Sequence, residues 1–194
     1  MDVDSNAVVV ETLERVWGFV KQRDDAWNIP PEEGRFLHTT ALATGAARLL
    51  ELGTSYGYST LWLAWAARKN YGRLITIDKE QRKRDQAMEH LRQADLEGVV
   101  VARVGQITDV LTELDGPFDF AFIDADKEPT RQYIDLLLDK LTDRATILID
   151  NVISHPEAFG DSLEYIRSHP SLWAMTVPVG HGVELLVKVE TESR

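Results

Sequence analysis

The chain has 194 residues, which is enough for one domain with a substantial core and too few for two ordinary ones. Its formal net charge of −11 argues against nucleic acid and membrane surfaces as partners, and the absence of cysteine excludes disulfides, thiolate metal sites and cysteine nucleophiles. No apolar run reaches the ~18–20 residues of a membrane helix, and the start of the chain has no signal-like pattern, so we expect a cytoplasmic protein.

Two helices are predicted before the first strand. The first covers residues 6–25, with Ser5 as its N-cap, and the second covers residues 31–44, where the fixed φ of Pro31 suits a first helical turn. The apolar positions of the first helix, between Val8 and Val20, would pack either on the chain's own domain or, in a homodimer, on a second subunit; the positions alone favour neither.

Short apolar segments then alternate with segments of helical spacing. The strand-like segments are 47–52, 74–77, 99–104, 118–123 and 145–149, and the helical ones are 58–69, 80–95, 107–114 and 129–141. Strands that are apolar on both faces are typical of a parallel sheet covered by helices. This alternation predicts a doubly wound α/β fold.

The end of the chain has a different rhythm. After a predicted helix at 161–168, strands at 172–177 and 183–189 lie close together around a Pro- and Gly-containing turn, as in an antiparallel hairpin. The full prediction is therefore a mostly parallel, seven-stranded, Rossmann-like sheet with an antiparallel C-terminal hairpin and two N-terminal helices. No repeat or linker interrupts it, so residues 1–194 are taken as one domain with residues 1–30 as a helical extension.

The first strand leads into a glycine-rich turn, with Gly53 and Gly57 four residues apart. Glycine lets the backbone turn tightly, and the helix that follows offers free N–H groups to an anionic ligand. The second strand ends in Asp78, whose carboxylate can accept hydrogen bonds from both ribose hydroxyls of a nucleoside. The alternatives are a plain strand-to-helix turn and an aspartate that only caps the helix at residue 80. The turn and the acid together favour a nucleoside site.

Polar residues also end two further strands. Asp124 follows the fourth strand, and Asp150 and Asn151 follow the fifth. Hard oxygen ligands of this kind suit Mg²⁺, with Ca²⁺ or Mn²⁺ as alternatives, although Asp and Asn are also common turn residues. Lys127 lies one helical turn beyond Asp124, where a nearby cation would lower its affinity for a proton and let it act as a base; otherwise it is a surface lysine that neutralises its acidic neighbours.

These segments resemble the metal-dependent O-methyltransferases typified by catechol and caffeoyl-CoA O-methyltransferase. The similarity runs from about residue 31 to residue 188, and its most specific parts are the segments 50–59 (LELGTSYGYS), 75–78 (ITID), 118–127 (FDFAFIDADK) and 149–151 (IDN). The resemblance implies transfer of a methyl group from S-adenosylmethionine (SAM) to a small catechol-like or phenolic acceptor, assisted by a divalent metal.

The resemblance also implies roles for individual residues. Asp124, Asp150 and Asn151 would hold the metal, Lys127 would be the general base, and Asp124 would share in catalysis. The residues expected to bind SAM are Glu51, Gly53, Gly57, Ser59, Asp78, Gly105, Gln106 and Asp124, with the Ser59 hydroxyl at the methionine carboxylate. Glu184 would touch the acceptor.

Three positions depart from the family pattern. Pro129 and Thr130 replace an Asn-Tyr pair, Gln106 replaces an aspartate near the adenine, and His181 replaces the aspartate of a Gly-Asp-Gly turn. These departures concern the acceptor more than SAM. Two other functions therefore stay open: SAM-dependent transfer without a metal, and a SAM- or nucleoside-binding module without turnover.

Aromatic residues give little further guidance. Any of five tryptophans can line an acceptor pocket, but Trp62 and Trp65 have the spacing of core residues on one helix. Of the five histidines, only His181 is expected near the site.

Overall fold

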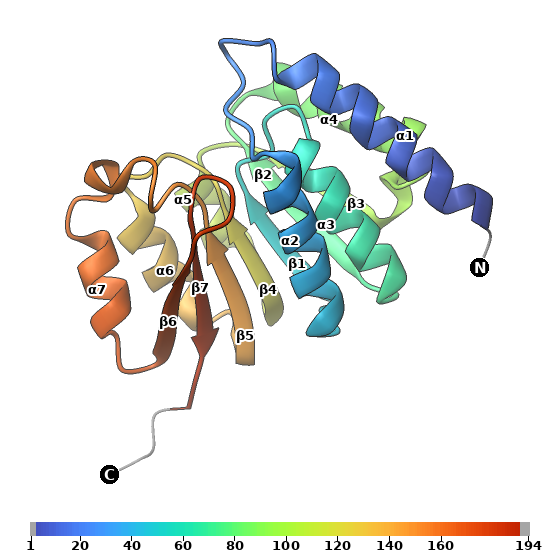
Figure 1. Ribbon diagram of the computed structural model, residues 1–194. Helices are drawn as coiled ribbons and strands as arrows, with labels where there is room; N and C mark the ends of the chain where they lie inside the picture. The colour runs from blue at the N-terminus through green and yellow to red at the C-terminus, as the bar shows by residue number, and fades with distance from the viewer. Residues whose placement is uncertain (1–2, 191–194) are drawn as a thin grey trace.

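The computed structural model describes residues 3–190 and contains a seven-stranded sheet between two layers of helices (Figure 1). The strands are β1 (Arg48–Leu52), β2 (Arg73–Asp78), β3 (Val100–Val104), β4 (Phe118–Ile123), β5 (Leu141–Ile149), β6 (Leu172–Val177) and β7 (Val183–Lys188). The helices are α1 (Val3–Val20), α2 (Pro31–Ala43), α3 (Tyr58–Lys69), α4 (Gln81–Gln93), α5 (Ile107–Glu113), α6 (Thr130–Leu138) and α7 (Ser162–Ser168), with 3₁₀ turns at Glu97–Val99 and Pro156–Phe159.

The strands lie in the order β3-β2-β1-β4-β5-β7-β6. The first five are parallel, whereas β7 runs antiparallel to both β5 and β6. The predicted doubly wound sheet and its C-terminal hairpin are confirmed. Because the strand order reverses between β1 and β4, the carboxyl ends of these two strands mark the place where α/β sheets bind ligands.

The two faces of the sheet bury separate apolar clusters. Leu49, Phe120 and Phe122 point toward α1–α4, whereas Leu50 and Ala121 point toward α5–α7. This alternation follows from the two-residue period of a strand and explains why the central strands are apolar throughout. Figure 1 shows the same division, with α1 lying across α3 and α4 and with α5, α6 and α7 beyond the opposite face.

Several predicted boundaries were wrong. Helix α1 begins at Val3, so Ser5 lies inside it and is not its N-cap, and it ends at Val20 rather than at residue 25. Helix α6 ends at Leu138, because Leu141, predicted as its last residue, pairs with Phe118 as the first residue of β5. An apolar residue at the end of a helical pattern fits either element until its partner is known.

Helix α1 packs on the chain's own core. Its buried apolar residues are Val9, Leu13, Val16 and Val20, whereas Val8, Val10 and Phe19 remain exposed. None of the helices in residues 3–190 is long and apolar enough to cross a membrane.

Candidate active site

The turn after β1 requires its two glycines. Gly53 has φ +102°, and a Cβ atom there would overlap the carbonyl oxygen of Asp124. Gly57 has φ +85° directly before α3, and a Cβ atom there would lie 2.7 Å from that of Ala87. Both backbone conformations disfavour any other residue. The turn therefore lies in direct contact with the end of β4 and with α4.

Glu51, in β1, bonds to side chains of α3 and β2 and so fixes the position of this turn. Its side chain is fully buried; Oε1 accepts a hydrogen bond from the Ser59 hydroxyl, and Oε2 accepts one each from Thr60 and Thr76, all at 2.6 Å. Burial raises the pKa of Glu51 to about 7, although these three hydrogen bonds oppose the shift. The carboxylate of Glu51 and the hydroxyl of Ser59, both predicted to contact SAM, therefore bond to each other and position the start of α3.

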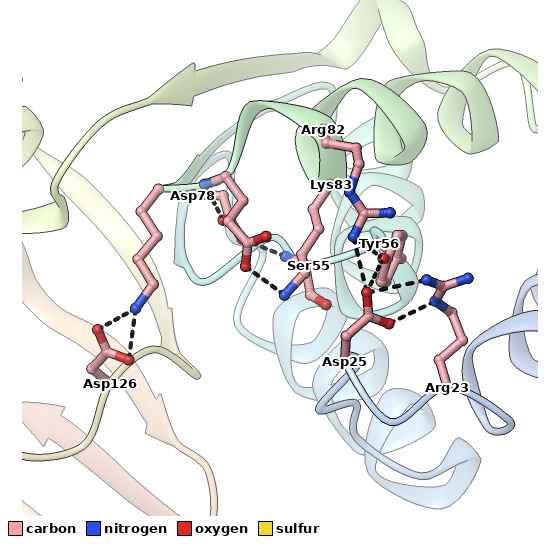
Figure 2. A network of polar contacts seen from close by, with 10 residues as sticks. Arg23, Asp25, Ser55, Tyr56, Asp78, Arg82, Lys83 and Asp126 are labelled. Atoms are coloured by element: carbon pink, nitrogen blue, oxygen red, sulfur yellow. Dashed lines mark hydrogen bonds and ion pairs between the residues drawn. The ribbon is translucent and has the colours of Figure 1, made fainter.

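Asp78 joins the same turn to the end of β2. Its Oδ2 accepts the Ser55 N–H at 2.7 Å, as Figure 2 shows. Its Oδ1 accepts the Glu80 N–H at 2.8 Å. The second bond is the helix-capping role that the sequence analysis gave as an alternative for Asp78. Asp78 also lines a cavity, so its carboxylate serves the turn and faces the space that a ligand would fill.

A second polar network fixes the segment between α1 and α2. The carboxylate of Asp25 accepts hydrogen bonds from Arg23, from the Tyr56 hydroxyl at 2.8 Å and from Arg82 at 2.9 Å (Figure 2). The bonds from Arg23 and Tyr56 lower the pKa of Asp25 far below its usual value. Because Tyr56 belongs to the glycine turn, this network ties the N-terminal segment to it.

The cavity has a volume of about 710 Å³ and lies at the carboxyl ends of β1, β2, β4 and β5. Predicted site residues that line it are Gly53, Asp78, Asp124, Lys127 and Asn151, whereas Glu51, Gly57, Ser59, Gly105, Gln106 and Asp150 are not among its lining residues. Gly105 is bonded to one of the lining residues, because its N–H donates to the carbonyl of Asp78 at 3.0 Å.

Two aromatic rings belong to the wall of this cavity. Trp27, which is 71% exposed, lies with its ring centre 5.6 Å from that of His155. The expectation that only His181 among the histidines lies near the site was therefore wrong. His155 lies directly before the 3₁₀ turn at Pro156–Phe159 and lines the cavity. The sequence pattern did not predict this position.

The predicted acidic residues meet at the ends of β4 and β5. Lys127 Nζ donates to Asp124 Oδ1 at 2.8 Å, and both side chains are nearly nine-tenths buried. Burial raises the pKa of Asp124 and the negative charge of Asp150 adds to this, whereas Lys127 opposes it. Asn151 adopts φ +72°, which asparagine tolerates better than most residues, and its N–H donates to Asp150 Oδ1.

Glu33 brings a further carboxylate to this acidic cluster, and the sequence analysis did not name it. It lies in the first turn of α2, fully buried, and its Oε2 accepts the N–H of His181 at 3.1 Å. Burial raises the pKa of Glu33, and the nearby carboxylates of Asp150 and Asp124 raise it further. Its Oε1 and the Nδ1 of His181 are buried without a hydrogen-bond partner among the described residues.

These residues fit a divalent cation. The carboxylates of Glu33, Asp124 and Asp150 are too close and too buried to carry their charges without compensation, and Lys127 supplies one positive charge. The amide oxygen of Asn151 adds a neutral hard ligand. The orphaned Glu33 Oε1 is the structural observation that a cation would explain.

Glu184 takes no part in the cavity. It is buried in β7, where its two carboxylate oxygens accept hydrogen bonds from Arg167, each at 2.8 Å, and Oε2 also accepts one from Thr176. It is not among the residues that line the cavity.

The strand order and the position of the cavity define a Rossmann-like α/β protein of the methyltransferase fold. Residues 50–152 match the family model described as a methyltransferase domain. The chain is 40% identical to a catechol O-methyltransferase of Niastella koreensis over 66% of this chain and 59% of the relative, and 34% identical to one of Mycobacterium tuberculosis over 77% and 73%. It thus spans less than two thirds of the length of the first of these relatives.

A solved structure of a Bacillus cereus O-methyltransferase in complex with S-adenosylhomocysteine (SAH) superposes with a TM-score of 0.81. The two chains share 27% identity over 93% of this chain and 90% of that one. The present chain belongs to the SAM-dependent O-methyltransferase family of the catechol and caffeoyl-CoA type.

Proposed function

We propose that this protein transfers a methyl group from SAM to a hydroxyl oxygen of a small catechol-like or phenolic acceptor, with a divalent cation at the ends of β4 and β5. One observation carries the proposal: the wall of a single cavity includes both Asp78 of the glycine-turn side and Asp124, Lys127 and Asn151 of the acidic side. The relatives named for catechol methylation and the neighbour named for its SAH complex support it.

The cofactor side would use main-chain geometry and Asp78. The ribose hydroxyls would donate to the carboxylate of Asp78, which keeps accepting capacity beyond its two main-chain bonds. Gly53 would let the turn lie against the main chain of Asp124, which keeps the cofactor side and the acidic side of the cavity close together. Glu51, Ser59 and Gly57 would act by holding the turn in position.

The acceptor side would use Asp124, Asp150, Asn151 and Lys127. A bound cation supplies Lewis-acid stabilisation of an acceptor oxyanion, and SAM supplies the activated methyl group. Lys127 would accept the hydroxyl proton of the acceptor, held in place by its bond to Asp124. The rings of Trp27 and His155, in the wall of the cavity, would pack against an aromatic acceptor.

The experiment that tests this function is transfer of a labelled methyl group from SAM to a panel of catechols, with Mg²⁺ and with EDTA. We expect product that depends on the cation. Turnover that is unchanged by EDTA would favour metal-independent transfer, and SAM binding without product on any acceptor would favour a binding module without catalysis.

A variant pair makes the test specific. Asp124→Ala is expected to abolish turnover and keep most of the affinity for SAM, measured by calorimetry. Asp139→Asn, at an exposed position after α6, is the matched control with one carboxylate removed. Unchanged turnover in Asp124→Ala would remove the acidic cluster from the reaction.

A homodimer in the cytoplasm remains part of the proposal. The exposed residues Val8, Val10 and Phe19 on α1 would provide an apolar contact for a second copy. Light scattering on the purified chain, and on a Phe19→Glu variant, measures the oligomeric state directly.

A further inference from the structure

We propose that Glu33 and His181 ligate the divalent cation of this chain together with Asp150, and that the resulting nitrogen and oxygen site prefers Co²⁺, Ni²⁺ or Zn²⁺ over Mg²⁺. The inference rests on the proposed function, because Asp150 belongs to both descriptions of the site.

The three side chains converge from distant parts of the fold. Glu33 comes from α2, Asp150 from the end of β5, and His181 from the turn between β6 and β7. One ligand atom from each lies within 4.8 Å of the other two, and His181 Nδ1 is 3.8 Å from Asp150 Oδ2. Ligand atoms at this spacing need only a small contraction to surround one ion.

Two of these ligand atoms are buried without partners. Glu33 is fully buried, and neither its Oε1 nor the Nδ1 of His181 has a hydrogen-bond partner among the described residues. Buried polar atoms in folded proteins are paired with very few exceptions, and each exception calls for an explanation. A cation between them pairs both atoms at once.

The turn that carries His181 is fixed against Glu33. A Cβ atom at Gly180 would overlap Oε2 of Glu33, so only glycine permits this approach. The N–H of His181 donates to the same oxygen, and the carbonyl of His181 accepts the N–H groups of Ser154 at 3.0 Å and Ile153 at 3.3 Å. The imidazole is therefore held beside Asp150 by main-chain bonds on both sides of it.

The chemistry of the ligands sets the preferred ion. Mg²⁺ is bound almost entirely by oxygen and keeps several waters, whereas an imidazole nitrogen suits Zn²⁺, Ni²⁺ and similar cations. Glu33 and Asp150 bring two carboxylates to this point, whereas the ammonium group of Lys127 is bonded to Asp124, so a cation between Glu33 and Asp150 would balance their charge. The alternative occupant of the space is a proton on His181, paired with Asp150 and without a metal.

The test is a titration of the whole chain with Co²⁺, followed by its visible absorption, and with Mg²⁺ as competitor. We expect Co²⁺ to bind at least tenfold more tightly than Mg²⁺. His181→Asn is expected to lose at least tenfold in Co²⁺ affinity with less than a threefold change for Mg²⁺, and Glu33→Gln to weaken both ions. His169→Asn, beside Tyr165 at the end of α7, is the matched control.

The outcomes separate this inference from the proposed function. Equal Co²⁺ affinity and an unchanged cobalt spectrum in His181→Asn, with thermal unfolding confirming that the variant folds, would overturn the inference even if methyl transfer proceeds with Mg²⁺. Dependence of Co²⁺ binding on His181 in a chain that methylates no catechol would uphold the metal site and overturn the function. A His181→Asp variant, which has only oxygen ligands, is expected to shift preference toward Mg²⁺.

Discussion

Gly53 and the main chain of Asp124 are in direct contact, so that a Cβ atom at position 53 would overlap the carbonyl oxygen of Asp124. The turn after β1 can therefore lie this close to the end of β4 only because residue 53 has no Cβ atom. The N–H of Asp124 also donates to the carbonyl of Leu52 at 2.8 Å, so a main-chain hydrogen bond joins the two segments as well.

Replacement of Gly53 by alanine is expected to destabilise the fold by about 3 kcal/mol and to weaken SAM binding, because it combines a positive φ with a backbone overlap. Gly45→Ala is the matched control: Gly45 has φ +67° with no atom within 4 Å of a new Cβ, so it should cost only the strain of a left-handed residue, about 1–2 kcal/mol. Urea unfolding and calorimetry with SAM measure both effects. Equal losses in the two variants would show that the contact with Asp124 is unimportant.

The buried carboxyl of Glu51 should make stability depend on pH. Its pKa is about 7 in the folded protein against an ordinary value of 4.5, so the folded state holds the proton more tightly than the unfolded state between these pH values. The stability of the wild type relative to Glu51→Gln should therefore fall as pH rises from 4.5 to about 7, by about 3 kcal/mol in all, and stay constant above that. Parallel stability curves for the two proteins would contradict this. The measurement is urea unfolding at a series of pH values without SAM.

Two variants separate the proposed role of Lys127 as a base from the effect of its positive charge. Lys127→Arg keeps a positive group beside Asp124 but provides no usable base, whereas Lys127→Met removes both. If Lys127 accepts the acceptor's proton, both variants should lower kcat by about 10²–10⁴-fold with little change in SAM affinity. Their residual rates should then increase with hydroxide concentration. Nearly full activity in Lys127→Arg would leave only an electrostatic role, and Lys21→Met, at an exposed position after α1, controls for loss of a lysine.

The sequence predicts the parts of the site that lie at the ends of strands. Asp78, Asp124 and Asp150 each follow an apolar run, and parallel strands bring their carboxyl ends to one edge of the sheet, so their proximity follows from the pattern alone. Glu51 was predicted to lie in the site, but its hydrogen bonds to the hydroxyl groups of Ser59, Thr60 and Thr76 were not predicted. The pattern of a strand does not show which polar side chains lie opposite each of its faces.

The remaining site residues depend on contacts across the whole chain. Glu33 and His181 are separated by 148 residues, and their contact requires the hairpin to reach α2. Glu32 and Glu33 are two acids in a first helical turn, where both would be expected to face the helix dipole from solvent. In the structure Glu32 is exposed and Glu33 is buried. The helical spacing carries a signal that the sequence analysis did not use, because Glu33 lies four and eight residues before the buried Leu37 and Ala41, on the same face of α2.

The salt bridge between Arg167 and Glu184 provides a test of whether Glu184 stabilises the fold or contacts the acceptor. Glu184 is 1% exposed, and burial raises its pKa, but the bonds from Arg167 and Thr176 outweigh burial and leave the pKa lowered. This pair should therefore stabilise the fold above the ordinary glutamate pKa, and the stabilisation should be lost as pH falls.

Arg167→Met should destabilise the protein at neutral pH by about 2 kcal/mol, less than for a fully buried pair because Arg167 is half exposed. Adding Glu184→Gln should recover part of the loss, since it removes the unpaired buried charge. Unfolding of the two single variants and the double variant gives the coupling free energy. Because Glu184 lies outside the cavity lining, Glu184→Gln should leave the KM for the acceptor within twofold of the wild type. A large rise in that KM, with little loss of stability, would instead assign Glu184 to the acceptor.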